Sequence, residues 1–166
     1  MKKNIIFLLL GCIVLFTSCL KSGLDDIEDS DQCTISSLTM EYRWITQNAN
    51  GYDQLSRQQM TLSNTAPDEN NEIHFTITVP SASSSFPTEI RERVSLQGLY
   101  LIAVISSAAK IEPLDGAPRL GFPETYEIGK DYRYEVTAAN GKKAVYHIVN
   151  SSLNISLTLM PLLLQI

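Results

Sequence analysis

The chain has few of the residues that most catalytic and metal sites require. Only two of its 166 residues are histidines, His74 and His147, and their spacing matches no zinc motif. Neither a Gly-x-Ser-x-Gly turn, which would hold an activated serine, nor a glycine-rich phosphate loop occurs. We therefore expect no metal site, no cofactor and no enzymatic activity.

Cysteine and positive charge are also scarce. The three cysteines are Cys12, Cys19 and Cys33, and the first two lie in the N-terminal segment discussed below. Cys33 then has no partner within the chain, which favours a small buried side chain or, alternatively, an intermolecular disulfide. Thirteen basic residues against eighteen acidic ones give a net charge of −5, so we expect no binding to nucleic acid.

Residues 1–18 have the pattern of a secretory signal peptide. Lys2 and Lys3 precede an apolar run, Ile5 to Phe16, that is too short to cross a bilayer as a helix. The sequence Phe16-Thr17-Ser18-Cys19 resembles a bacterial lipobox, in which a bulky apolar residue and two small residues precede an acylated cysteine. We expect cleavage before Cys19 and lipidation of that residue, which would anchor the protein to a membrane.

Residues 19–32 are predicted to form an acidic tether between the lipid and the fold. Five acidic residues occur between Asp25 and Asp31 with few large apolar neighbours, a composition that resists compaction. An acidic cluster after the lipidated cysteine also resembles the surface-export signal of Bacteroides-type lipoproteins. That resemblance implies the bacterial outer membrane with the domain exposed at the cell surface; the alternative is a solvated linker.

Residues 33–150 are predicted to form one all-β domain. The clearest strand is 72–79, where Ile73, Phe75, Ile77 and Val79 alternate with polar residues. Other strands are expected at 40–44 and 58–62. The segment Leu99–Ile105 is almost entirely apolar and predicts a central strand covered on both faces. Short strands between loops rich in Gly, Pro and Ser favour an antiparallel β-sandwich with immunoglobulin-like (Ig-like) architecture.

The last hairpin can be predicted in register. A two-residue turn at Asn140-Gly141 would place the apolar residues of its two strands on opposite faces. A three-residue loop, Ala139-Asn140-Gly141, instead pairs Tyr134 with Tyr146 and Val136 with Ala144, so the apolar sets share a face. We therefore predict a type I turn followed by Gly141 in the left-handed region.

The stretch from Tyr134 to Val149, YEVTAANGKKAVYHIV, resembles the recurrent ending of an Ig-like domain family of unknown function found in Bacteroides-type surface lipoproteins. Ser95-Leu96, Ile111-Glu112-Pro113 and the segment 116–121 are also similar to that family. The resemblance covers residues 33–149. It implies an Ig-like fold and a cell-surface location, and it implies no activity.

Residues 151–166 depart from the family ending. Leu153, Ile155, Leu157 and Leu159 alternate with Ser, Asn and Thr, as in an amphipathic strand, and the apolar segment 161–166 follows. The sequence allows three interpretations of this segment: a final paired strand, a disordered or truncated end, and a strand that pairs with a partner.

Two classes of function fit this sequence. The first is an accessory glycan-binding lipoprotein, in which exposed aromatic rings stack on a polysaccharide; the candidates are Trp44, Tyr52, Tyr100 and Tyr126. Trp44 is in phase with Met40 and Tyr42, so it fits a core position equally. The second class is a structural spacer or an adhesion and assembly module that contacts another surface protein. A flat patch of exposed aromatics would favour the first class, and a polar sandwich with an open edge strand the second.

Overall fold

The structure is a computed structural model that describes residues 30–155. The predicted signal peptide, the lipidation site Cys19, most of the acidic tether and residues 156–166 lie outside the described residues. The elements are β1 (Ile35–Gln47), β2 (Asp53–Leu62), β3 (Glu72–Val79), α2 (Thr88–Arg91), β4 (Leu99–Ile105), β5 (Lys110–Pro113), β6 (Pro123–Glu124), β7 (Asp131–Thr137) and β8 (Lys143–Ile155).

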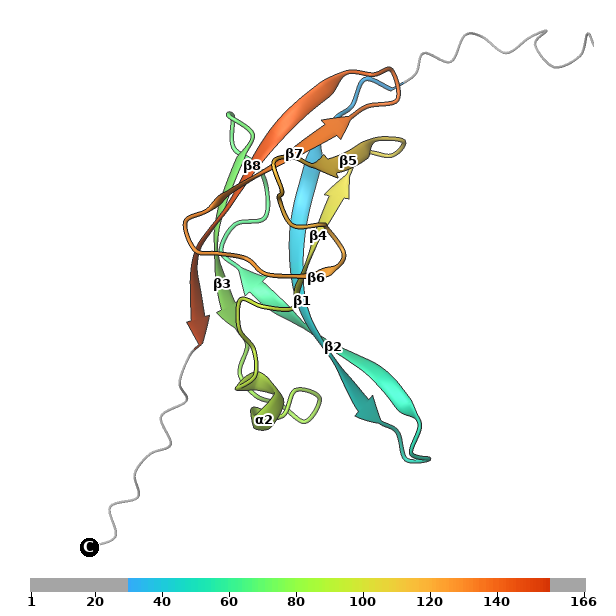
Figure 1. The fold of residues 1–166 in the computed structure, drawn as a ribbon, viewed down its shortest axis with the longest axis vertical. Helices are drawn as coiled ribbons and strands as arrows, with labels where there is room; N and C mark the ends of the chain where they lie inside the picture. Colours follow the sequence, from blue (N-terminus) through green and yellow to red (C-terminus); the bar gives the residue numbers. More distant parts are fainter. Residues whose placement is uncertain (1–29, 156–166) are drawn as a thin grey trace, which may run out of the picture.

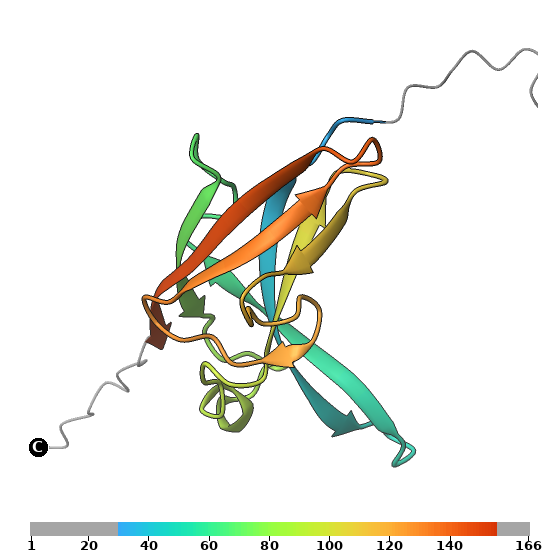
Figure 2. The ribbon, with the colours of Figure 1, turned by 45° about the horizontal axis from the view of Figure 1, so that its top comes forward.

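The fold is all-β, as predicted. Its eight strands form a sheet of order β5-β7-β8-β3-β2-β1-β4-β6. Strands β2 and β3 share only two residue pairs, Thr61 with Thr78 and Leu62 with Ile77, and the sheet curls at this weak junction. As a result β7 and β8 lie across β1 and β4 (Figures 1 and 2), and side chains from both parts form one core.

The strand pairing is mixed, so the prediction of a purely antiparallel sheet is wrong. All neighbouring strands are antiparallel except β3 and β8, which run parallel from the pair Glu72 and His147 to the pair Val79 and Ile155. Parallel neighbours require a long connection. Here that connection contains α2 and strands β4 to β7. The one hairpin that was predicted joins β7 and β8, which follow one another in the chain.

Strand β3 and the last hairpin match the predictions. The four apolar residues of β3 are buried and face the core. In the hairpin Tyr134 pairs with Tyr146 and Val136 pairs with Ala144. Gly141 has a φ of +87°, and its N–H donates to the carbonyl of Ala138 over 3.0 Å, which closes the predicted turn.

Strand β4 is covered on one face only, which corrects the prediction of a central strand. Leu99 and Leu101 are buried, whereas Val104 is 48 % exposed on the outer face. Beyond β4 in the strand order lies only the two-residue β6. An apolar run of this length therefore does not distinguish a central strand from a strand near the end of a sheet.

The N-terminal and C-terminal parts of the fold meet in the core. Cys33 is buried and free, in agreement with the expected small buried side chain, and its carbonyl accepts a 3.0 Å hydrogen bond from the hydroxyl of Tyr146. Strand β8 continues past the predicted domain boundary at 150, so residues 151–155 are part of a paired strand. The helix α2 is a single turn, and no helix among residues 30–155 is long and apolar enough to cross a bilayer.

Candidate functional site

The aromatic candidates do not form a common surface. Trp44 lies near the C-terminal end of β1 and is half-buried. Its ring packs against those of Tyr42 and Phe86, with ring centroids 6.0 Å and 5.7 Å apart, respectively. Its indole nitrogen is buried. Trp44 therefore joins the core to the loop before α2, as its phase along β1 allowed.

Tyr126 does not offer an exposed ring, which corrects its choice as a sugar-stacking candidate. It is 1 % exposed, and its ring meets that of Tyr132 edge to face with centroids 5.8 Å apart. Burial raises the pKa of the Tyr126 hydroxyl well above its ordinary value. The segment that holds Tyr126 packs on the core, and the N–H of Tyr126 donates a 2.9 Å hydrogen bond to the carbonyl of Leu96.

Tyr100 lies on the outer face of β4 and is half-buried. The guanidinium carbon of Arg43 lies 4.2 Å from the centre of its ring, a cation–π arrangement. Glu41 holds Arg43 in place through an ion pair of 2.8 Å. One face of Tyr100 is therefore occupied by a side chain of the protein itself.

Tyr52 is the one candidate with an open ring, at 70 % exposure. It lies in the turn between β1 and β2, where the side-chain oxygen of Asn48 accepts 3.0 Å hydrogen bonds from the N–H groups of Asn50 and Tyr52. Gly51 adopts a φ of +78°, which a glycine allows without strain. Tyr52 was named from the sequence as a candidate exposed ring, and its ring is exposed.

Two further apolar residues are exposed beside this turn. Ile45 and Leu55 are paired across β1 and β2, and they are 60 % and 61 % exposed. Directly opposed residues lie on the same face of a sheet. We call Ile45, Tyr52 and Leu55 the hairpin tip. The β1–β2 hairpin projects from the body of the fold, and the hairpin tip lies on this projection (Figure 1).

Sequence reasoning did not select Ile45 and Leu55. The one signal that could have found Ile45 is its phase along β1. Met40, Tyr42 and Trp44 occupy the core-facing positions, which places Ile45 on the outer face together with Glu41 and Arg43. An apolar residue on an otherwise polar face points to an exposed apolar surface, whereas an apolar residue at a core position only confirms the core.

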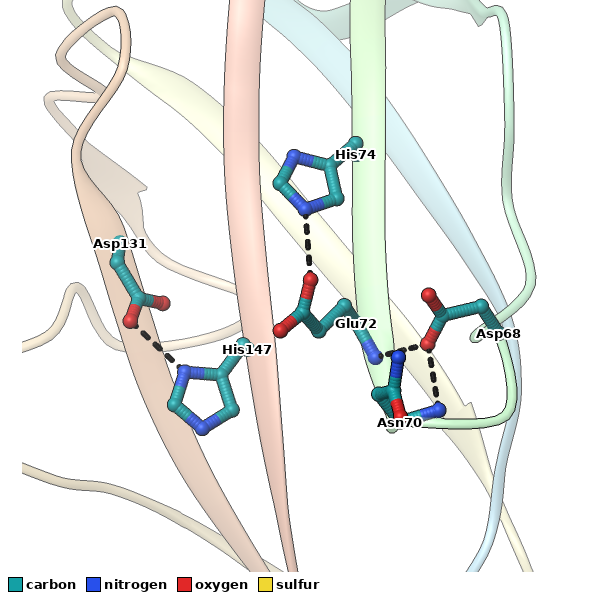
Figure 3. A network of polar contacts seen from close by, with 6 residues as sticks. All are labelled: Asp68, Asn70, Glu72, His74, Asp131 and His147. Atoms are coloured by element: carbon teal, nitrogen blue, oxygen red, sulfur yellow. Dashed lines mark hydrogen bonds and ion pairs between the residues drawn. The ribbon is translucent and has the colours of Figure 1, made fainter.

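The two histidines lie on neighbouring strands of the opposite part of the sheet. Figure 3 shows that His74 contacts Glu72, with nitrogen and oxygen 3.0 Å apart, and that His147 contacts Asp131 at 2.7 Å. Strand β3 begins at a turn in which Asp68 accepts 2.8 Å hydrogen bonds from the N–H groups of Asn70 and Glu72.

This polar cluster has two histidine–carboxylate contacts on a solvent-exposed face. Glu72 and His147 are direct neighbours across the parallel pair β3 and β8. Among the described residues, no group of three or more His, Cys, Asp or Glu side chains could hold a metal ion. One of its two contacts lies within β3, and the other joins β7 to β8.

The comparisons with known proteins concern the whole fold. A sequence family described as DUF5018-related matches residues 35–149. The crystal structure of a Bacteroides fragilis protein for which secretion has been proposed is similar, with a TM-score of 0.66 and 24 % sequence identity. The match covers 75 % of this chain and 98 % of that protein. Among curated proteins, no sequence matches this chain.

Proposed function

The chain belongs to the DUF5018-related family, whose match covers most of the described fold, and we propose the following function for it. The protein is a lipid-anchored module at the cell surface, without catalytic activity, that acts in adhesion or assembly. It contacts a protein partner through the hairpin tip, Ile45, Tyr52 and Leu55. Exposure of these three apolar side chains on one projection is the observation that carries the proposal.

The hairpin tip has the chemistry of a protein contact. One aromatic ring and two aliphatic side chains are exposed on the same hairpin, and the turn that holds Tyr52 is fixed by the hydrogen bonds of Asn48. Protein interfaces concentrate their binding energy in a few such side chains, with aromatic residues enriched. Since the turn is already ordered, its conformational entropy would not be lost on binding.

The position of the hairpin supports display away from a membrane. The described chain begins at one end of the long axis, and the β1–β2 turn lies at the other end (Figure 1). Cys19 and Ser30 are eleven residues apart, so an acylated Cys19 would leash the fold by at most about 40 Å of extended chain. A fold leashed at this end leaves the hairpin tip as the part farthest from its attachment. The proposed secretion of the similar Bacteroides fragilis protein agrees with export of this chain.

A protein partner is favoured over a polysaccharide by the arrangement of aromatic rings. A sugar-stacking platform needs two or three open faces in one plane, whereas Trp44 packs on Phe86, Tyr126 is buried and Arg43 covers Tyr100. Tyr52 is the one candidate that keeps an open ring, and a single ring does not make such a platform.

Site-specific photocrosslinking on intact cells tests this function. The full chain would carry p-benzoylphenylalanine in place of Tyr52, and a matched control would carry it in place of Phe122, an exposed aromatic residue outside the hairpin. We expect a discrete, protease-sensitive adduct from position 52 and none from position 122. A protease-resistant glycan adduct, equal adducts from both positions, or no adduct from position 52 would contradict the proposal.

A further inference from the structure

The last five residues of β8 are paired on one side only. Strand β7 pairs with β8 as far as Val149, whereas β3 accompanies the other side of β8 to Ile155. Among the described residues, no backbone hydrogen bond joins the side of Ser151–Ile155 that faces away from β3 to another segment. We call these five residues the free edge.

The free edge borders a part of the core that is incompletely covered. Leu153 packs against the core, and together with Ile155 it lines an open groove of about 500 Å³. The opposite wall of the groove includes Val94, Leu96 and Tyr126. Ile155 is 39 % exposed. A strand added beside β8 would extend the sheet over this groove and cover the exposed parts of Leu96, Leu153 and Ile155.

The free edge lacks the features that normally prevent strand addition. Proteins protect edge strands with charges, with proline or by keeping them short. At the two ends of the sheet these devices are present: β5 carries Lys110 and ends at Pro113, and β6 has two residues. By contrast, no Asp, Glu, Lys or Arg occurs between Ala144 and Ile166. The alternation of Leu153 and Ile155 also continues in the sequence at 157 and 159.

The chain's own continuation is poorly suited to cover this edge. To return alongside Ser151–Ile155 as a tight hairpin, it would have to turn within residues 156–160. Residues 156–160 are Ser-Leu-Thr-Leu-Met and contain none of the Gly, Asn, Asp or Pro residues that tight hairpin turns require. A strand from outside the chain is therefore the better partner.

We infer that the free edge pairs with the free edge of a second copy of this chain, antiparallel and around a two-fold axis perpendicular to the sheet. Such an axis keeps the core-facing sides of both strands on the same face, so Leu153 and Ile155 of each copy extend over the groove of the other. Two uncharged, alternating strands are complementary in this arrangement, and the interface closes on itself. The free edge and the hairpin tip are different surfaces, so this dimer is independent of the proposed function.

Analytical ultracentrifugation of residues 20–166 over a range of concentrations tests the dimer. Omitting residues 1–19 removes none of the described contacts, since these begin at Ser30. We expect a reversible dimer for the wild-type chain. Asn154→Lys should weaken dimerisation at least tenfold, because it places like charges close together across the two-fold axis. Asn70→Lys adds the same charge at an exposed turn and should dimerise as the wild type does.

Hydrogen exchange of the backbone amides in Ser151–Ile155 supplies a second readout. We expect slow exchange on the free edge in the dimer and fast exchange in Asn154→Lys, with β3 protected in both. If that variant fails to fold by circular dichroism, Ser151→Lys, at an exposed position of the same edge, replaces it. A wild-type monomer at every concentration, a monomer whose edge amides are protected by its own chain, or variants that dimerise unchanged would overturn the inference.

Discussion

Replacing Tyr134 with phenylalanine tests how the buried tyrosines hold the sheet to its loops. Tyr134 is fully buried on β7, and its hydroxyl donates a 2.8 Å hydrogen bond to the carbonyl of Pro118. Tyr134→Phe keeps the ring but leaves this carbonyl without its donor. A buried polar group that loses its partner costs about 1–3 kcal/mol. We expect a loss of about 2 kcal/mol in the free energy of unfolding, and a midpoint lower by roughly 5–10 °C for a domain of this size.

The same hydroxyl makes stability depend on alkaline pH. Burial raises the pKa of Tyr134 and also that of Tyr126, both from an ordinary value of 10.0. Above pH 10 the unfolded chain releases these protons while the folded chain retains them. The unfolded state then binds fewer protons, so stability is fully present below pH 10 and falls as pH rises above it. Each such tyrosine contributes a slope of about 1.4 kcal/mol per pH unit, and Tyr134→Phe removes one of the two.

Urea denaturation of wild type, Tyr134→Phe and Tyr52→Phe, near neutral pH and at about pH 11, measures both effects. Tyr52 is exposed, so its variant should match the wild type at both pH values. Unfolding of Tyr134→Phe at the wild-type urea concentration near neutral pH would mean that the hydrogen bond to Pro118 does not stabilise the fold. An equal loss of stability in wild type and Tyr134→Phe at high pH would mean that the Tyr134 proton is not retained by the folded chain.

Three further substitutions give distinct outcomes. Gly141→Ala places a side chain at a φ of +87° and should cost about 1–2 kcal/mol in thermal unfolding; an unchanged melting temperature would contradict the predicted turn. Phe86→Ala removes a fully buried ring that packs on Trp44, so we expect a loss of about 3–5 kcal/mol and a red shift of tryptophan fluorescence; an unshifted spectrum would place Trp44 elsewhere. Leu55→Ser should change stability by less than about 0.5 kcal/mol while reducing crosslinking from position 52; a large loss of stability would mean that Leu55 has a packing role.

The local features of the fold could be predicted from the sequence because their causes are local. The period-two pattern of β3 sets which side chains are buried, and the apolar sets of β7 and β8 allow only one turn length at Asn140-Gly141. Burial of Cys33 followed from its lack of a partner and its apolar character.

The remaining features depend on contacts between distant segments. Nothing in either β3 or β8 specifies that they run side by side and parallel, since their separation in sequence exceeds 60 residues. Tyr126 lies in a loop by composition, yet that loop covers the core through contact with Tyr132. The hairpin tip was found in part, because Tyr52 is a turn residue, whereas the exposure of Ile45 and Leu55 depends on how far the β1–β2 hairpin projects beyond the body.

Thiol labelling of intact cells tests whether the hairpin tip faces outward from the cell. Tyr52→Cys would be treated with a membrane-impermeant maleimide in cells that express the full chain. Cys33 is buried, and an acylated Cys19 leaves no free thiol there, so the wild-type chain should stay unlabelled. We predict labelling of Tyr52→Cys on intact cells. Labelling that appears only after lysis, or labelling of the wild type, would contradict the account.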